Sequence, residues 1–371
     1  MFGLTKKIRY AVVGGGQISQ QAFMPGIGQT KHSELAALVT GDPVKADKLA
    51  KQYGIPAYHY DDLPKLIAGD EIDAFYIATP NFKHRQYAVP VLEGGKHVLL
   101  EKAMEVSVED CEAIIAAQKK GGGKLMIAYR LHCEPGTVEL ITRAQKGDFG
   151  RLMMFNSTFG QNFSEENHRG HSGYWAGPVP DSGTYPLNAV RNLFGEEPLE
   201  VRAIGVKTPG RSFNFHDTVS VTLTFPDNRL AHFLVSYACS MVEEFTLVGD
   251  KGTVHAAPCF MFGPGEGISY TATIGEKKEE RPHKAVEQFG GETDYFSECI
   301  LNDRDPEPNG EEGLMDVRVL AAIERALETG EVQKLAPAKR SRHVEPDQVR
   351  DLKLAKEPTP DQMISIVPQS A

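Results

Sequence analysis

The chain has 371 residues, of which 41% are hydrophobic and 24% are charged, close to the average of ordinary globular proteins. This composition excludes a disordered, collagen-like or coiled-coil chain, and the length predicts two or three folded units. A formal net charge of −10 disfavours nucleic-acid binding as the main role, and no apolar run approaches the roughly 20 residues that span a bilayer. With five dispersed cysteines and no signal peptide, we expect a cytosolic protein without a metal site or membrane contact.

Residues 1–130 alternate short apolar runs with amphipathic stretches. The predicted strands are Ile8–Val13, Glu34–Val39, Ala74–Ile77, His97–Leu100 and Leu125–Ala128. The predicted helices are Gln17–Ile27, Pro43–Tyr53, Phe82–Glu93 and Ser107–Lys120. Strands this short and apolar are typical of a parallel sheet buried on both faces, and helical crossovers between them give βαβ units. The pattern predicts an α/β domain with a doubly wound parallel sheet.

Residues 131–336 change to alternating, β-branched runs separated by hairpin-like turns. The predicted strands are Leu152–Phe159, Val201–Val206, Thr218–Phe225, Leu230–Tyr237, Glu244–Val248 and Thr253–His255. The predicted helices are Thr137–Lys146, Glu287–Leu301 and Glu311–Glu328. We expect an α+β domain with a large, mostly antiparallel sheet that helices cover on one face. The polar residues 337–371 are expected to form an extended arm.

A glycine-rich turn follows the first predicted strand. The segment Gly14–Ser19 reads G-x-G-x-x-S, with Gln17 and Ile18 between the second glycine and the serine. In such a turn Gly14 permits the tight bend, and Gly16 lets backbone amides approach a pyrophosphate at a helix N-terminus. Because the turn lies between a strand and a helix, it predicts a dinucleotide-binding site.

The end of the second strand bears on which dinucleotide is bound. It lacks a carboxylate at the usual place and reads Thr40, Gly41, Asp42, with Lys45 in the first turn of the next helix. A hydroxyl and a lysine there suit the 2′-phosphate of NADP, whereas a carboxylate would suit the ribose of NAD. The alternative is that Asp42 caps the helix and Lys45 is a solvated surface residue. We expect NADP, with NAD as the alternative.

Polar clusters follow three further strands, at the sheet edge where ligands collect in open α/β folds. Their candidate cofactor-binding residues are Thr79, Pro80, Asn81, His84, Glu101, Lys102 and Arg130. The Asn and His are also explained as helix-capping residues. The pair Glu101 and Lys102 lies where the nicotinamide end of a dinucleotide is expected.

These motifs, in this order, resemble the family of glucose–fructose oxidoreductase and inositol dehydrogenase (Gfo/Idh/MocA), most closely its glucose–fructose oxidoreductase branch. The family's marks are a glycine-rich turn, a T-P-N-x-x-H segment, an E-K-P motif and a D-x-x-x-H or D-x-x-x-Y segment. Here they are Gly14–Ser19, Thr79–His84, Glu101–Ala103 and Asp181–Tyr185. The resemblance covers about residues 8–335, and it departs from the family where Ala103 replaces the proline of E-K-P.

The resemblance implies a Rossmann domain followed by a domain whose open sheet serves oligomer contacts, hence a homodimer or homotetramer. It also implies NAD(P)-dependent oxidation or reduction of sugars and related compounds. In the branch that the chain resembles most, the cofactor is NADP, and the counterpart of Lys45 contacts the 2′-phosphate. Some members of the family keep the nucleotide bound through a cycle of two substrates.

Hydride transfer needs a group that takes the hydroxyl proton of the substrate. The sequence offers Tyr185 as the general acid/base, with Lys102 orienting substrate and nicotinamide and favouring the phenolate form of Tyr185. Asp181, one helical turn before Tyr185, is expected to bind a sugar hydroxyl or Lys102. Taken singly, Asp181 also fits a helix cap and Tyr185 a packed tyrosine at a helix start.

The loop before Asp181 contains His168 and Trp175, which are candidates for hydrogen bonding and stacking to a sugar. A plain surface loop explains them equally well. A histidine pair there could bind zinc, but no further ligands complete a set, so no metal is expected.

The function predicted from these residues is an NADP-dependent oxidoreductase acting on a sugar. Two alternatives remain. One is an NAD-dependent dehydrogenase of a cyclitol or glycoside. The other is a nucleotide-sensing regulatory protein without catalysis, which the presence of Lys102, Asp181 and Tyr185 disfavours.

Overall fold

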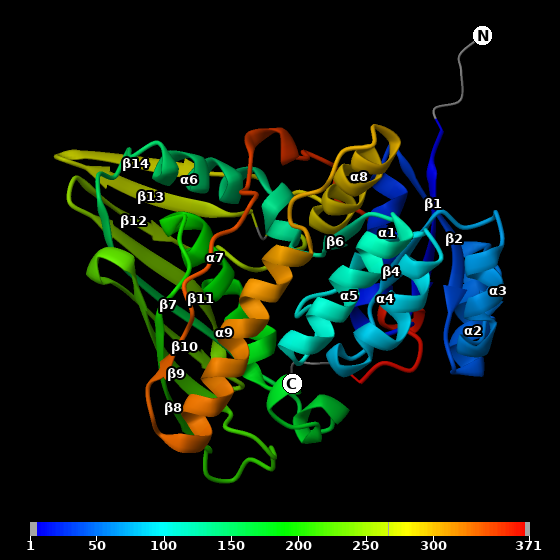
Figure 1. Cartoon of the computed structure of the whole chain (residues 1–371), viewed down its shortest axis with the longest axis horizontal. Helices are drawn as coiled ribbons and strands as arrows, with labels where there is room; N and C mark the ends of the chain where they lie inside the picture. Colours follow the sequence, from blue (N-terminus) through cyan, green and yellow to red (C-terminus); the bar gives the residue numbers. More distant parts are fainter. Residues whose placement is uncertain (1–5, 266, 368–371) are drawn as a thin grey trace. The chain divides into compact units, whose positions relative to one another are not determined.

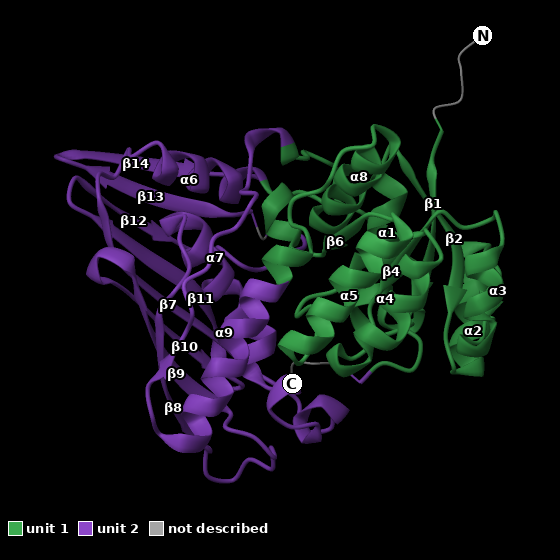
Figure 2. Cartoon of the chain, viewed as in Figure 1, with its two compact units in different colours: residues 1–134, 286–313, 348–366 green, residues 135–285, 314–347, 367–371 purple. Residues whose placement is uncertain are grey.

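The computed structural model describes residues 6–265 and 267–367. The chain forms two compact units (Figure 2). Unit 1 comprises residues 1–134, 286–313 and 348–366, and unit 2 comprises residues 135–285, 314–347 and 367–371. Neither unit is a single stretch of sequence, so the boundaries expected at residues 130 and 336 differ from the boundaries of the units.

Unit 1 contains a parallel sheet whose six described strands lie in the order β3-β2-β1-β4-β5-β6 (Figure 1). The strands are β1 (Ile8–Val13), β2 (Ser33–Val39), β3 (Ala57–Tyr58), β4 (Ala74–Ile77), β5 (His97–Leu100) and β6 (Leu125–Ile127). This is the strand order of a doubly wound dinucleotide-binding fold. The predicted fold class is confirmed, although the two-residue strand β3 was too short to recognise in the sequence.

The helices of unit 1 follow the strands closely. They are α1 (Met24–Gly26), α2 (Pro43–Tyr53), α3 (Leu63–Ala68), α4 (His84–Glu93), α5 (Val108–Gly121) and α8 (Gln288–Leu301). The predicted helix after β1 is less regular than expected, because Ser19–Phe23 forms a π-helical turn before α1. Across residues 6–265 and 267–367, no helix combines the length and the apolar character needed to cross a membrane.

Helix α8 belongs to unit 1 because it buries one face against the sheet. Phe296 and Tyr295 lie in the same hydrophobic cluster as Tyr10 and Phe23. The hydroxyl of Ser297 is 2.9 Å from the hydroxyl of Tyr10. The chain therefore leaves the first unit after residue 134 and returns to it at residue 286, which corrects the assignment of α8 to the second domain.

The polar segment expected as an extended arm also packs on unit 1 over residues 348–366. Ile364 is 8% exposed and joins the cluster of Tyr10 and Phe23. The guanidinium of Arg350 is 2.6 Å from the carboxylate of Glu298 on α8. Side chains such as Ile364 and Arg350 thus hold residues 348–366 against unit 1, although their polar composition predicted an extended arm in solvent.

Unit 2 contains a mixed sheet whose nine described strands lie in the order β14-β13-β12-β11-β7-β10-β9-β8-β15. All neighbouring pairs of these described strands are antiparallel except β7 with β10. The strands are β7 (Leu152–Asn162), β8 (Glu200–Val206), β9 (Thr218–Phe225), β10 (Arg229–Ser236), β11 (Ala238–Gly249), β12 (Gly252–Ala256), β13 (Ser269–Ile274), β14 (Lys277–Pro282) and β15 (Gln333–Lys334). The predicted antiparallel sheet is confirmed; the hairpin of β13 and β14 was missed.

The helices of unit 2 are α6 (Pro135–Gln145), α7 (Thr184–Phe194) and α9 (Gly310–Thr329), the last of which begins in unit 1. Helix α7 packs against β7 and β10. Figure 1 shows α7 and α9 on one side of the sheet. Residues that alternate with the buried ones point to the opposite side, where Met154 and Leu230, paired across β7 and β10, are 53% and 50% exposed.

A buried ion-pair network stabilises the end of α7. Arg191 is fully buried, with its guanidinium 2.6 Å from Glu197 and in contact with Asp316 on α9. Arg340 adds a second guanidinium, 2.8 Å from Glu197. Two cations therefore balance two buried carboxylates, which avoids an uncompensated charge in the interior.

Candidate active site

The glycine-rich turn has the geometry of a phosphate-binding site. Gly14 has φ +105°, and a Cβ there would lie 2.8 Å from the backbone oxygen of Ala78, so only glycine fits. A Cβ on Gly16 would meet nothing within 4 Å, which leaves its backbone open to a ligand. The hydroxyl of Ser19 donates a 2.6 Å hydrogen bond to the oxygen of Gly14 and fixes the turn.

Two buried polar atoms near this turn accept or donate no hydrogen bond within the described part of the chain. They are Oε1 of Gln17, on the first turn after the glycines, and Oγ1 of Thr79, at the end of β4. Buried polar groups normally have partners, so both atoms indicate contacts with a bound group. Because the carboxyl ends of β1 and β4 are adjacent, the two atoms fit one dinucleotide.

The sequence offered two interpretations of the residues after β2: a helix cap at Asp42, or Thr40 and Lys45 beside a bound phosphate. The structure contains elements of both. The carboxylate of Asp42 caps α2 by accepting from the backbone amides of Val44 (2.9 Å) and Lys45 (3.2 Å). The aliphatic part of Lys45 lies over the phosphate turn, since a Cβ on Gly15 would be 3.5 Å from its Cδ. The hydroxyl of Thr40 would be 3.7 Å from the same Cβ. Lys45 and Thr40 therefore border the turn, whereas Gly41 lies exposed beside them.

The segment after β4 is divided between surface and interior. Pro80 is exposed, and Asn81 begins a 3₁₀ turn. His84 is fully buried, and its ring nitrogens lie 2.9 Å from the oxygen of Thr79 and 3.1 Å from that of Met104. Burial lowers the pKa of His84 to about 4, and the neutral ring donates one hydrogen bond, to one of these two oxygens. The ring of His84 therefore packs inside unit 1, and its contact with a cofactor stays a prediction.

Glu101 is also interior. It is 8% exposed, accepts a 2.6 Å hydrogen bond from the hydroxyl of Tyr76 and a 3.1 Å bond from the amide of Lys102. Burial raises its pKa, opposed by the bond from Tyr76 and the charge of Lys102. Glu101 therefore helps to fix the backbone of Lys102 through this bond. The peptide bond between Lys102 and Ala103 is cis.

Helix α8 contributes a second carboxylate to this interior. Glu292 is fully buried, and neither of its oxygens has a hydrogen-bond partner among the described residues. Burial raises its pKa well above the ordinary value, and the charge of Glu101 raises it further, while the charge of Arg130 lowers it. Arg130 is 4% exposed, donates to Oε1 of Gln288 and lies over the ring of Phe289. Arg130 thus contacts α8, and its place at the cofactor stays a prediction.

In unit 2, the carboxylate of Asp181 has two side-chain partners that the sequence did not indicate. Its Oδ2 accepts a 2.7 Å hydrogen bond from the hydroxyl of Tyr237, and its Oδ1 is 3.1 Å from the guanidinium of Arg169. Burial raises the pKa of Tyr237 well above its ordinary range, so the phenol keeps its proton and donates. Within unit 2, Asp181 is anchored by these two residues, and it lies in the π-helical turn that precedes α7.

Tyr185 lies in the first turn of α7 and is half-buried between aromatic rings. Its ring centroid is 5.8 Å from that of Phe159 on β7 and 5.9 Å from that of Phe260. Both phenylalanines are almost fully buried. The ring of Tyr185 is therefore held by packing, as a residue that moves a proton at a fixed position requires.

The loop that precedes Asp181 is ordered by hydrogen bonds within unit 2. The indole nitrogen of Trp175 donates a 3.0 Å bond to Glu324 on α9, and the hydroxyl of Tyr174 donates to the oxygen of Leu320. His168 is exposed. Trp175 is thus bonded to α9 through the only polar atom of its side chain. Within residues 6–265 and 267–367, no three His, Cys, Asp or Glu side chains form a potential metal site.

Sequence reasoning missed Arg169, Tyr237 and Glu292. Arg169 lies in the segment of His168 that the sequence singled out, but no spacing rule connects it to Asp181, twelve positions further along the chain. Tyr237 lies between β10 and β11 and Glu292 on the distant helix α8, so only the tertiary structure reveals them.

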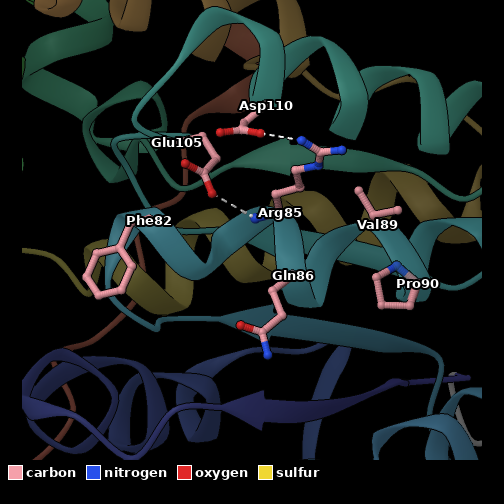
Figure 3. A pocket seen from close by; sticks show the side chains of 7 residues that line it. All are labelled: Phe82, Arg85, Gln86, Val89, Pro90, Glu105 and Asp110. Atoms are coloured by element: carbon pink, nitrogen blue, oxygen red, sulfur yellow. Dashed lines mark hydrogen bonds and ion pairs between the residues drawn. The ribbon is translucent and has the colours of Figure 1, made fainter.

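A separate open hollow lies on the surface of α4 (Figure 3). It is lined by Phe82, Arg85, Gln86, Val89, Pro90, Glu105 and Asp110. The guanidinium of Arg85 is 2.6 Å from Asp110, and its backbone amide donates to Glu105. The only cation in the hollow is therefore neutralised, and none of the predicted site residues lines it.

Comparison with known proteins agrees with this geometry. Residues 8–129 match the family described as an oxidoreductase family with an NAD-binding Rossmann fold, and residues 138–255 match the GFO/IDH/MocA C-terminal domain. Together the two matches include more than half of the chain. The chain belongs to the GFO/IDH/MocA oxidoreductase family. The resemblance inferred from the motifs is thereby confirmed, and the protein is an NAD(P)-dependent oxidoreductase of this family.

Several members of this family are similar along most of their length. The solved structure of an aldose–aldose oxidoreductase from Caulobacter crescentus in complex with glycerol is 34% identical, with a TM-score of 0.82, covering 89% of this chain and 100% of that one. A D-xylose 1-dehydrogenase [NADP(+)] of Haloarcula marismortui is 27% identical over 88% of this chain and 93% of its own. A scyllo-inositol 2-dehydrogenase (NADP(+)) of Bacillus subtilis is 30% identical over 67% and 75%, respectively.

Proposed function

We propose that this protein is an NADP-dependent oxidoreductase that transfers hydride between the nicotinamide and a sugar. The observation that carries this proposal is the 34% identity, over the full length of the relative, with the aldose–aldose oxidoreductase. The similarity to an NADP-dependent D-xylose dehydrogenase supports the same substrate class, and both this relative and the inositol dehydrogenase are NADP-dependent. Aldoses are therefore the first substrates to test.

The preference for NADP is supported by the end of β2. Lys45 and Thr40 border the phosphate turn, and Oδ1 of Asp42 accepts the two backbone bonds that cap α2. A cation rather than a carboxylate at this position favours a 2′-phosphate. Bound in this way, NADP supplies the hydride acceptor, and the chain supplies binding, orientation and proton transfer.

The proposed proton-transfer group is Tyr185, with Lys102 acting on the same substrate hydroxyl. Bound NADP would supply the hydride acceptor for the sugar carbon, and the phenol oxygen of Tyr185 would take the proton of the sugar hydroxyl. The ammonium of Lys102 stabilises negative charge on the sugar oxygen. Asp181 acts indirectly, since its bonds to Arg169 and Tyr237 fix the turn that precedes Tyr185.

Replacing Tyr185 by Phe tests the mechanism. We expect kcat for aldose oxidation to fall by about 10²–10⁴-fold, the usual contribution of a general acid/base, while NADP affinity stays unchanged. Tyr53→Phe, on α2, is the matched control. Wild-type turnover in Tyr185→Phe, with cofactor bound, would show that another group moves the proton.

A cyclitol is the alternative substrate class, supported by the similarity to the inositol dehydrogenase. A panel of aldoses and inositols, each with NADP and NAD, distinguishes the two. A higher kcat/KM for inositols would replace the sugar proposal, and tenfold tighter binding of NAD would replace NADP.

The proposed assembly is a homodimer or homotetramer that uses the uncovered face of the unit 2 sheet. Exposed apolar side chains lie along β7, β8 and β10; they are Met154 (53%), Ile204 (74%), Val206 (53%) and Leu230 (50%). An apolar group of this kind is typical of a protein–protein contact. Light scattering of the purified protein gives the oligomeric state directly.

A further inference from the structure

The helix that follows the phosphate turn is joined to the C-terminal segment (residues 348–366) through one side chain. Gln20 lies in the π-helical turn after β1 and is 1% exposed. Its amide nitrogen donates to the backbone oxygens of Gly15 (2.9 Å) and Ile364 (3.0 Å). Its amide oxygen accepts from the backbone nitrogen of Ile364 at 2.7 Å. Both hydrogens of the amide nitrogen are thereby used.

The bond to Gly15 acts on the phosphate turn itself. Because the oxygen of Gly15 is held by Gln20, the peptide unit that joins Gly15 to Gly16 has a fixed orientation. The amide hydrogen of Gly16 belongs to the same planar unit, opposite to that oxygen. A Cβ on Gly16 would meet open space, so the backbone at this position is accessible to a pyrophosphate.

The C-terminal segment is anchored at several further points along unit 1, where Figure 1 draws it in red. Arg350 forms a 2.6 Å ion pair with Glu298 of α8 and lies over the ring of Tyr295. Glu287, at the start of α8, donates from its backbone to Leu352 and accepts from Ala355 through its carboxylate. The part of the segment that precedes Ile364 is therefore held against α8.

The end of the segment is fixed by packing as well as by hydrogen bonds. Ile364 is 8% exposed and lies in the same hydrophobic cluster as Phe23, three residues after Gln20. Burial of this branched aliphatic side chain also stabilises the contact, so the two bonds to Gln20 do not have to hold the segment alone. The family matches at residues 8–129 and 138–255 do not include this segment, so it is a feature of this chain beyond those two domains.

We propose that the C-terminal segment acts through Gln20 to hold the phosphate turn in its binding conformation and so slows release of the dinucleotide. Gln20 is a positioning residue in this scheme, and it does not contact the reacting atoms. A turn that is already ordered loses less conformational entropy when the pyrophosphate binds, and binding is therefore tighter. The inference depends on the proposed function only in requiring that a dinucleotide occupies the turn.

Gln20→Met tests this inference, since methionine keeps the length of the side chain and removes all three hydrogen bonds. Ile364→Ala is the second variant; it weakens the same junction from the C-terminal side and leaves the helix sequence intact. Gln29→Met, on the same helical segment after β1, is the matched control. NADPH is bound to each protein and its release is followed by fluorescence after addition of excess NADP⁺.

We expect both junction variants to release NADPH about tenfold faster than wild type, the effect of losing roughly 1.4 kcal/mol of binding free energy. The rate of hydride transfer in a single turnover at saturating cofactor should stay unchanged. Wild-type release rates in both variants, or a lower melting temperature without faster release, would overturn the inference. Absence of NADPH binding in the wild-type chain would instead overturn the proposed function.

Discussion

The buried carboxyl of Glu292 gives a prediction about stability and pH. Burial and the neighbouring charge of Glu101 raise its pKa, against the opposing charge of Arg130. Above about pH 4.3, the ordinary pKa of glutamate, the unfolded state has lost this proton. A folded state that keeps the proton therefore binds more protons than the unfolded state. Stability is then lost as the pH rises from there to the folded pKa, by about 1.4 kcal/mol for each pH unit.

Glu292→Gln removes this loss, because an amide has nearly the shape of the protonated carboxyl and does not ionise. We therefore expect the variant to gain stability relative to wild type as the pH increases. Between pH 5.5 and 7.5 the difference in free energy of unfolding should widen by up to about 2.7 kcal/mol, for as long as the folded carboxyl keeps its proton. Urea unfolding at pH 5.5, 6.5 and 7.5 measures it.

The exposed Glu112 on α5 provides the matched control. For Glu112→Gln, the difference in free energy of unfolding from wild type should not change across this pH range. The reasoning is refuted if the free-energy difference for Glu292→Gln is also independent of pH.

Three further substitutions test other parts of the structure. Gly14→Ala places a Cβ 2.8 Å from the oxygen of Ala78 at a positive φ, so thermal unfolding should show a loss of about 1–3 kcal/mol and NADP affinity should fall. Arg191→Met leaves the fully buried Asp316 without its cation and should cost about 3–5 kcal/mol in urea unfolding, whereas a neutral result would contradict the ion-pair network. Leu230→Lys introduces a charge on the uncovered sheet face and should shift the oligomer towards monomer in light scattering; an unchanged mass would place the interface elsewhere.

Periodicity and composition were sufficient for most of unit 1. The bounds of β1, β4, β5 and α2 were predicted to the residue, because short apolar runs between amphipathic helices have few alternative structures. The hairpin of β13 and β14 escaped notice because Lys277–Pro282 is a charged edge strand without an apolar face.

The candidate site was predictable only as far as local motifs reach. The glycine turn and Lys45 lie where the sequence indicated, since the strand–turn–helix context is encoded in neighbouring residues. The burial of His84 and Arg130 was not predicted, because polarity alone does not tell a buried side chain from an exposed one. The bond between Asp181 and Tyr237 joins residues 56 positions apart, which no spacing rule covers.

The interrupted layout of unit 1 affects how this protein can be made and divided. Its central sheet is formed from the first 134 residues, but part of the apolar surface of that sheet is covered by α8 and by Ile364, which are synthesised much later. A fragment that ends at residue 134 would leave Tyr10 and Phe23 partly uncovered, and would tend to aggregate rather than bind nucleotide. The core of unit 1 is therefore complete only once α8 and Ile364 have been synthesised.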